Sequence, residues 1–325
     1  MLIDNHHRSI SYLRLSVTDR CNLRCSYCMP ATIRFRNRKE LLSDEEIIRL
    51  AAVLAPEGIN KVRITGGEPF SRRGLPLLLE RLLKIKGIET LSLTSNGILA
   101  LPYLETLAGL GIRDINLSMD TLQKKRFREI TGSDTFHLVW KAFEKCLHLK
   151  MRLRINTVVM AGINTDELRD FALLTALYPV DVRLIEEMPF NGKSDPGRHS
   201  SWDHRRILAE LSSCAELEER PRLPGATATN YKVKGHVGSI GIIPAYSRTF
   251  CGTCNRLRIT STGAIKTCLY GDDVLNVRDL MRSGASDSAL LERINAALGN
   301  RHLNGWEAAG NRQNALLENM SAIGG

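Results

Sequence analysis

The chain has 325 residues, of which 43% are apolar, and it carries 45 basic against 35 acidic residues, a formal net charge of +10. Eight cysteines in this length are too few for a secreted disulfide scaffold. No apolar stretch approaches the roughly 20 residues of a membrane-spanning helix, and Met1–Ile10 lacks the apolar core of a signal peptide, so we expect a cytoplasmic globular protein. The positive charge favours anionic partners, either polyphosphate ligands or nucleic acid.

Short apolar runs alternate with amphipathic stretches along the first part of the chain. The predicted strands are Tyr12–Val17, Lys61–Thr65, Thr90–Thr94, Asp114–Ser118, Leu153–Val159 and Val182–Glu186. The predicted helices are one that begins after the S-x-x-E capping box at Ser43, then Leu75–Ile85, Leu101–Leu110, Phe136–Leu149 and Thr165–Leu177. This alternation predicts an α/β fold with a parallel sheet. Unusual polar residues at the strand ends favour a partial TIM-type barrel of six βα units over an open doubly wound sheet.

The alternation breaks at Asn191–Ser201 and again at Pro221–Ala228, which are rich in Gly, Pro, Ser or Thr. We therefore predict two domains, 1–220 and 221–325. The second is a smaller α+β region with strands at Tyr231–Val237, Ser239–Ile243 and Leu257–Thr260, followed by helices from about Asn276.

Six of the eight cysteines form two triplets. Cys21, Cys25 and Cys28 have C-x3-C-x2-C spacing in a loop after the first predicted strand, so one short loop can turn three sulfurs toward one point. Three thiolates with no fourth nearby suit a cubane iron–sulfur cluster that leaves one iron open to an exogenous ligand. The alternative is structural zinc, which prefers four ligands.

The second triplet, Cys251, Cys254 and Cys268, repeats this logic and predicts a second cluster with an open iron. His302 could instead complete a zinc site, although a histidine so far downstream is more often an ordinary surface or helix residue. The remaining cysteines, Cys146 and Cys214, lie on helix-like segments, and we predict that both are buried apolar thiols.

An ordered set of motifs runs through nearly the whole chain, from Arg14 to Gly325. The set comprises the two cysteine triplets, Thr65-Gly66-Gly67-Glu68-Pro69, Thr94-Ser95-Asn96-Gly97, Asn255-Arg256-Leu257-Arg258 and the Gly324-Gly325 pair. It resembles the GTP 3′,8-cyclase family of radical S-adenosylmethionine (SAM) enzymes. The resemblance implies a radical SAM partial barrel with a [4Fe-4S] cluster on Cys21, Cys25 and Cys28, and an auxiliary [4Fe-4S] cluster on Cys251, Cys254 and Cys268.

The resemblance also implies roles for individual residues. Arg14 and the first triplet match the family's catalytic residues, and SAM-contacting positions are matched by Tyr27, Gly67, Ser118 and Met188. GTP-binding positions are matched by Arg14, Arg63, Thr94, Arg154, Arg256, Leu257 and Arg258. Arg154 stands where the family usually has a lysine. Apart from the resemblance, Arg183 in the sixth predicted strand is a weaker candidate, since a charge in a mostly apolar strand is costly unless it is partnered. The Gly324-Gly325 pair matches a tail that inserts toward the active site.

The implied chemistry opens molybdenum cofactor biosynthesis. SAM is cleaved to a 5′-deoxyadenosyl radical that removes the C3′ hydrogen of GTP, and the C3′ radical then attacks guanine C8. Reduction of the resulting aminyl radical gives (8S)-3′,8-cyclo-7,8-dihydroguanosine 5′-triphosphate. The second cluster would take the guanine base as a ligand.

The implied partners are an electron donor and, downstream, cyclic pyranopterin monophosphate synthase. We expect a monomer or homodimer, with no nucleic-acid or membrane partner. Two other hypotheses remain at this point. One is a radical SAM enzyme that modifies peptides or RNA with an auxiliary cluster, and the other is a zinc-bearing nucleic-acid-binding protein, which the charge of +10 supports.

Overall fold

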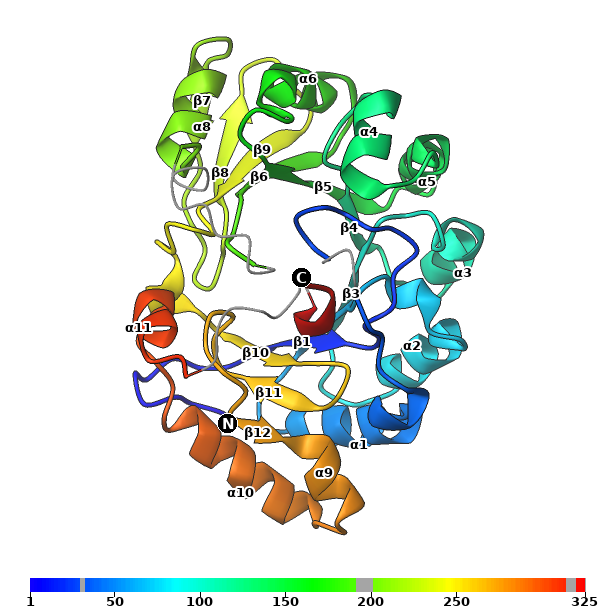
Figure 1. Ribbon diagram of the computed structural model, residues 1–325, viewed down its shortest axis with the longest axis vertical. Coiled ribbons are helices and arrows are strands. Elements are labelled where there is room, and N and C mark those ends of the chain that lie inside the picture. The colour runs from blue at the N-terminus through cyan, green and yellow to red at the C-terminus, as the bar shows by residue number, and fades with distance from the viewer. Residues whose placement is uncertain (30–32, 191–200, 314–319, 325) are drawn as a thin grey trace. The chain divides into compact units, whose positions relative to one another are not determined.

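The computed structural model describes residues 1–29, 33–190, 201–313 and 320–324 (Figure 1). The backbone divides into two compact units. Unit 1 consists of Met1–Asn22, Thr32–Thr94 and Cys251–Gly325, and unit 2 consists of Leu23–Ala31 and Ser95–Phe250. The predicted break at Asn191–Ser201 falls almost entirely outside the described residues, and the domain limits 1–220 and 221–325 stay a prediction.

In unit 1, strands from the two ends of the chain pair side by side. The strands are β1 (Tyr12–Ser16), β2 (Lys61–Thr65), β3 (Thr90–Ser95), β10 (Arg256–Ile259), β11 (Ala264–Lys266) and β12 (Leu275–Asn276). β1 pairs in parallel with both β10 and β2, and β2 pairs in parallel with β3. β11 and β12 extend the sheet beyond β10 with antiparallel pairing. Figure 1 shows the blue β1 next to the orange-yellow β10, although about 240 residues separate them in the sequence.

One face of this sheet forms an apolar core. Leu13 pairs in register with Leu257 on one side and Val62 on the other, and all three are fully buried. Side chains alternate between the faces of a strand, so the residues directly before and after each of these three positions point to the opposite face. The helices of unit 1 are α1 (Asp44–Leu54), α2 (Leu75–Leu83), α9 (Val277–Arg282), α10 (Asp287–Leu298), α11 (Gly305–Gly310) and α12 (Met320–Ile323).

Unit 2 has its own run of parallel strands. β4 (Asp114–Ser118), β5 (Arg152–Val159), β6 (Asp181–Glu186) and β9 (Ser239–Ile243) pair in parallel in this order. β8 (Thr229–Val233) and β7 (Leu217–Glu219) continue from β9 with antiparallel pairing. The helices are α3 (Leu104–Gly109), α4 (Lys124–Thr131), α5 (Phe136–His148), α6 (Leu168–Leu177) and α8 (His204–Ser212).

The α/β class with parallel strands is confirmed, and each of the six strands predicted in the first part of the chain is present. The capping box is also present, since Ser43 Oγ accepts from Glu46 N and the Glu46 carboxylate accepts from Ser43 N. The predicted strand Tyr231–Val237 is too long. β8 ends at Val233 because the chain turns at Gly235, whose φ is +80°.

The prediction for the two helical cysteines is half right. Cys146 is buried on α5, whereas Cys214 is exposed just beyond the end of α8, so the prediction of a buried thiol at Cys214 is wrong. In the part of the chain that the structure describes, none of the helices combines the length and apolar content needed to cross a bilayer.

Candidate functional site

Charged side chains gather on the face of the unit 1 sheet that is opposite its apolar core. The register of β10, β1 and β2 aligns two rows of three residues, and the rows are two residues apart along each strand, which places both on the same face. We call these six residues the cationic face: Arg256, Tyr12 and Lys61 in one row, and Arg258, Arg14 and Arg63 in the next. Five of the six carry a positive charge. The sequence predicted four of these arginines as substrate-binding residues, and the structure brings all four together.

Tyr12 lies at the centre of this charge. Arg63 Nε donates a hydrogen bond to Tyr12 Oη at 2.5 Å, and Arg63 Nη1 donates to Leu93 O at 3.1 Å. Lys61 Nζ lies 4.9 Å from the centre of the Tyr12 ring and Arg256 Cζ lies 5.9 Å from it. Burial opposes ionisation of the phenol, but the charges of Arg63 and Arg14 outweigh it and lower the pKa of Tyr12 to about 7.

The second row is crowded with like charge. Burial and the neighbouring arginines lower the pKa of Arg14 to about 10 and that of Arg258 to about 9. Arg14 Nε is buried and has no hydrogen-bond partner among the described residues. Buried cations packed at this density are costly unless an anion offsets them, and guanidinium groups match phosphate oxygens bidentately. The cationic face therefore fits a polyphosphate.

The second cysteine triplet adjoins the cationic face. Cys251–Thr253 forms a single 3₁₀ turn in which Cys254 N donates to Cys251 O at 3.1 Å. Arg256 Nη1 donates to Cys254 Sγ at 3.6 Å, so one arginine joins this thiol of the triplet to the face. Burial opposes ionisation of the Cys254 thiol, but the charges of Arg256 and Arg301 outweigh it and lower its pKa to about 7. A thiolate is the form that ligates iron, so this donor set fits a cluster.

The first triplet follows a close approach between two backbone segments of unit 1. Gly67 N donates to Thr18 O and Glu68 N donates to Arg20 O, each at 2.8 Å. A Cβ atom on Gly67 would lie 2.3 Å from Arg20 O, which no real Cβ tolerates. The glycine pair is thus needed to hold this strand end against the residues that lead into Cys21.

Cys25 and Cys28 occupy a tight turn in unit 2. Cys25 O accepts from both Cys28 N and Met29 N at 3.0 Å. Between them, Tyr27 Oη donates to Asp120 Oδ2 at 2.8 Å, and Asp120 Oδ1 accepts from Val158 N at 2.9 Å. Burial raises the pKa of Asp120 to about 6. All three thiols of the first triplet are half-buried.

Gly324 of the tail lies against the carboxyl ends of β1 and β2. Its φ is +85°, and a Cβ atom there would lie 2.4 Å from Thr65 Oγ1 and 3.0 Å from Ser16 Cβ. Gly324 O also accepts from Arg258 Nη1 at 3.4 Å. The tail glycine therefore contacts the cationic face, while Gly325 lies outside the described residues.

The other predicted residues have more varied surroundings. Thr94 has a buried hydroxyl without a hydrogen-bond partner among the described residues. The Leu257 side chain is fully buried in the core, which leaves only its backbone for a ligand. Met188 packs against the apolar cluster of Ala228, Ile243 and Ala245. Ser118, at the end of β4, is half-buried.

Arg154 is held by carboxylates of unit 2. Its Nη1 donates to Asp114 Oδ1 at 2.6 Å, and its Nε lies 3.7 Å from Asp181 Oδ2, beyond hydrogen-bond length. Arg183 is half-buried in β6, in register with Asn156. Both arginines carry positive charge on half-buried strands.

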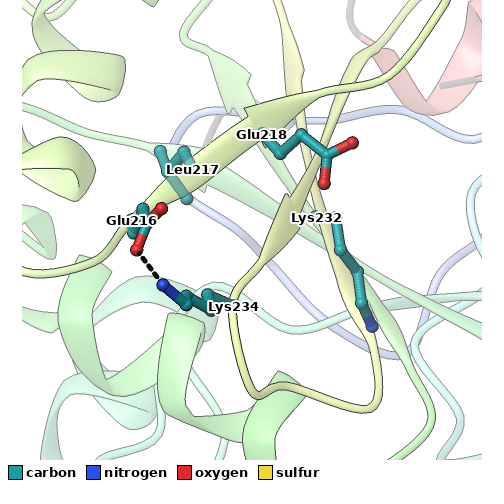
Figure 2. Close-up of a pocket in the computed structure, with 5 residues that line it drawn as sticks. All are labelled: Glu216, Leu217, Glu218, Lys232 and Lys234. Atoms are coloured by element: carbon teal, nitrogen blue, oxygen red, sulfur yellow. Dashed lines mark hydrogen bonds and ion pairs between the residues drawn. The ribbon is translucent and has the colours of Figure 1, made fainter.

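A pocket elsewhere in unit 2 does not carry comparable chemistry. Figure 2 shows that its lining comes from the β7–β8 hairpin and that Glu216 and Lys234 pair across it, 3.0 Å apart. Lys232 Nζ donates hydrogen bonds to the backbone carbonyl oxygens of His236 and Gly238. Across the described residues, which include both cysteine triplets, no three or more His, Cys, Asp or Glu side chains are grouped so as to bind a metal ion. The fit of the triplets to clusters therefore rests on their donor chemistry and spacing in the sequence.

Sequence reasoning missed three residues of this region. Tyr12 is two residues from Arg14, and the period of a strand could have placed both on one face. Asp120 follows the fourth strand and is a carboxylate at a strand end. Arg301 approaches Cys254 across 47 residues of sequence, and no local pattern indicates that contact.

Two family models match the chain in succession. Residues 15–175 match the radical SAM superfamily and residues 180–305 match the Molybdenum Cofactor Synthesis C family. Among solved structures, Streptococcus suis SuiB bound to S-adenosylmethionine is similar, with a TM-score of 0.60 and 16% identity over 87% of this chain and 67% of that one. At this identity the likeness shows the fold alone.

Curated relatives cover nearly the whole chain. A human protein named Molybdenum cofactor biosynthesis protein 1 is 40% identical over 92% of this chain, which spans 48% of the human protein. The chain thus spans about half the length of the first curated relatives. A GTP 3′,8-cyclase from Heliobacterium modesticaldum is 41% identical over 90% of each chain, and one from Syntrophomonas wolfei is 37% identical over the full length of both. The chain therefore belongs to the GTP 3′,8-cyclase family of the radical SAM superfamily.

Proposed function

We propose that this chain is a GTP 3′,8-cyclase, which converts GTP to (8S)-3′,8-cyclo-7,8-dihydroguanosine 5′-triphosphate at the start of molybdenum cofactor biosynthesis. The observation that supports this most directly is the contact between Arg256 and Cys254, because it joins the cationic face to a thiol of the second triplet. A nucleoside triphosphate can use both at once, its phosphates on the cationic face and its base toward the thiols. A peptide or RNA substrate would not account for a cationic face directly beside a thiol of the second triplet.

Four arginines of the cationic face would bind and orient the triphosphate: Arg14, Arg63, Arg256 and Arg258. GTP brings about four negative charges, and charge-assisted hydrogen bonds are roughly twice as strong as neutral ones. Arg154 and Thr94 are further candidates, through charge and an unpaired buried hydroxyl. Binding of GTP would offset the repulsion among the arginines by their attraction to the phosphates. The bound phosphates would in turn hold the ribose in one orientation.

Cys21, Cys25 and Cys28 would hold the first cluster, with SAM placed by Tyr27, Gly67, Ser118 and Met188. Bound there, the cluster and SAM supply the one-electron chemistry that removes the C3′ hydrogen of GTP. Asp120 fixes the Tyr27 ring beside two of the thiols through its hydrogen bond. Cys251, Cys254 and Cys268 would hold the auxiliary cluster, and Gly324 would close the tail over the cationic face.

The product would pass to cyclic pyranopterin monophosphate synthase, and the electrons would come from a separate donor. We expect a monomer or homodimer in the cytoplasm. Both remain predictions.

The test is an oxygen-free assay of protein reconstituted with iron and sulfide. SAM, dithionite and GTP are added, and 5′-deoxyadenosine and a cyclised guanine nucleotide are followed by mass spectrometry. We expect both products to form together and to depend on GTP. Cleavage of SAM with unchanged GTP would overturn the substrate assignment and favour a peptide or RNA modifier. Bound zinc with no cleavage of SAM would overturn the whole proposal.

GTP binding without turnover tests the cationic face separately. Loss of a charged hydrogen bond costs about 1.5–3 kcal/mol, so Arg258→Ala should weaken GTP binding roughly 10- to 100-fold. The affinity for GMP, which lacks the outer phosphates, should fall much less in Arg258→Ala. The matched control is Arg73→Ala, because Arg73 is exposed and follows the Gly-Gly-Glu-Pro segment. Equal losses for the two variants would refute the role of the face.

A further inference from the structure

Arg301 makes a dense set of contacts around the second cysteine triplet. Its Nη2 donates to Cys254 Sγ at 3.1 Å and to Arg256 O at 3.2 Å. Its Nη1 donates to Cys254 O at 3.1 Å. The Arg301 side chain is only 3% exposed, so these bonds form away from water. One guanidinium therefore holds both the backbone and the sulfur of Cys254.

The N-terminal segment of unit 1 holds this arginine in place. Arg301 Nη1 also donates to Asp4 Oδ2 at 3.1 Å, and the Asp4 side chain is completely buried. Arg8 Nε donates to the same oxygen at 2.7 Å. Arg8 Nη1 then donates to Cys251 O at 3.1 Å. Asp4 thus orients two arginines, one bonded to a carbonyl and the other to a sulfur of the Cys251–Cys254 turn.

Arg301 and Arg8 differ in what they can do to a cluster. Hydrogen bonds to ligand sulfurs are among the factors that set the reduction potential of an iron–sulfur cluster. A cationic donor favours the more negative, reduced state, whereas a bond to a backbone carbonyl mainly fixes the chain. We propose that Arg301 is a positioning residue for the auxiliary cluster, where its hydrogen bond to the Cys254 sulfur retains the cluster and raises its reduction potential. This inference rests on the proposed function, because it assumes a cluster on the second triplet.

The experiment isolates the second cluster by using the full chain with Cys21→Ala, Cys25→Ala and Cys28→Ala. This parent is reconstituted with iron and sulfide. Bound iron, its rate of loss to a chelator and the midpoint potential are then measured for the parent and for Arg301→Gln. We expect a more negative potential in Arg301→Gln and roughly 10-fold faster loss of iron, the lower end of the effect of losing an outer-shell partner.

Arg8→Gln is the matched control. It is the same chemical change at a second buried arginine, and it removes another partner of Asp4 without touching a sulfur. Its potential should equal that of the parent. Arg301→Lys keeps the charge opposite Asp4 but has three donors for four contacts, so its potential should lie between those of the parent and Arg301→Gln.

The outcomes separate the two claims. If a cluster forms in the parent and the potential is the same in Arg301→Gln, or shifts equally in Arg8→Gln, the inference is wrong and the proposed function stands. If Arg301→Gln does not fold, an unchanged potential in Arg301→Lys overturns the inference. If the parent binds no cluster, the two-cluster proposal fails and the inference fails with it.

Discussion

Replacing Gly67 with alanine tests the close backbone contact at the entrance to the first cysteine loop. The backbone conformation of Gly67 does not itself exclude alanine, because its φ is not positive. The added methyl would lie 2.3 Å from Arg20 O and 2.8 Å from Asp19 O, both of which are backbone atoms that cannot rotate away. Overpacking costs about 1–3 kcal/mol. Breaking the two backbone hydrogen bonds to Thr18 and Arg20 costs about 1 kcal/mol each. The free energy of unfolding should fall by about 3–5 kcal/mol.

Urea denaturation of wild type and variant measures this loss directly, and the iron retained after reconstitution shows whether the cysteine loop is displaced. Gly109→Ala is the matched control, because a Cβ atom there meets nothing within 4 Å and the residue ends helix α3 with an ordinary φ. It should be neutral or stabilising by about 0.5–1 kcal/mol. If Gly67→Ala unfolds at the same urea concentration as wild type and retains its iron, the steric reasoning is wrong.

Three further predictions concern single residues of the site. Tyr12→Phe should destabilise the protein by about 1.5–3 kcal/mol through loss of the charged bond to Arg63. The pKa of Tyr12 is about 7 in the folded protein and has its ordinary value of 10 in the unfolded chain, so ionisation of Tyr12 stabilises the fold above pH 7 and reaches its full effect above pH 10. The difference in free energy of unfolding between wild type and Tyr12→Phe should therefore grow from pH 7 to pH 10 in denaturation experiments. Arg154→Lys keeps the charge, and titration should give a GTP dissociation constant within about threefold of wild type; a tenfold loss would mean that the arginine fork itself binds GTP. Gly324→Ala should reduce cyclisation roughly tenfold with little loss of GTP binding, because a left-handed backbone costs an alanine about 1–2 kcal/mol; unchanged turnover would show that the tail need not dock.

Much of the fold follows from local patterns in the sequence. The capping box at Ser43 starts α1 where predicted, and the β-branched runs become strands because each also presents an apolar side to a core. Helix α4 was missed because its sequence is mostly charged, with only Phe127, Ile130 and Thr131 buried. The length of β8 was overestimated because a single glycine ends it.

The candidate site was predictable in its residue types and not in its contacts. Cysteine spacing and arginines in apolar strands are visible in the sequence, and the register of β1 with β2 and β10 turns those arginines into one face. Which charge lies next to which thiol depends on contacts between distant segments. The bonds from Arg301 to Cys254 and from Asp4 to Arg301 are of this kind, and local periodicity holds no information about them.

The pairing of β1 with β10 has a consequence for synthesis on the ribosome. Unit 2 is nearly continuous, whereas β1, which can pair with β2 early, cannot gain its second neighbour, β10, until residues 256–259 have been made. At about 5–20 residues per second, tens of seconds separate the first strand from its partner at the slower rates. During this time the apolar side of β1 lacks its contacts with Leu257 and Ile259, so the early segment is exposed to chaperones, and the cationic face lacks Arg256 and Arg258. The second cysteine triplet is likewise completed late, because Cys268 follows β10 in the sequence.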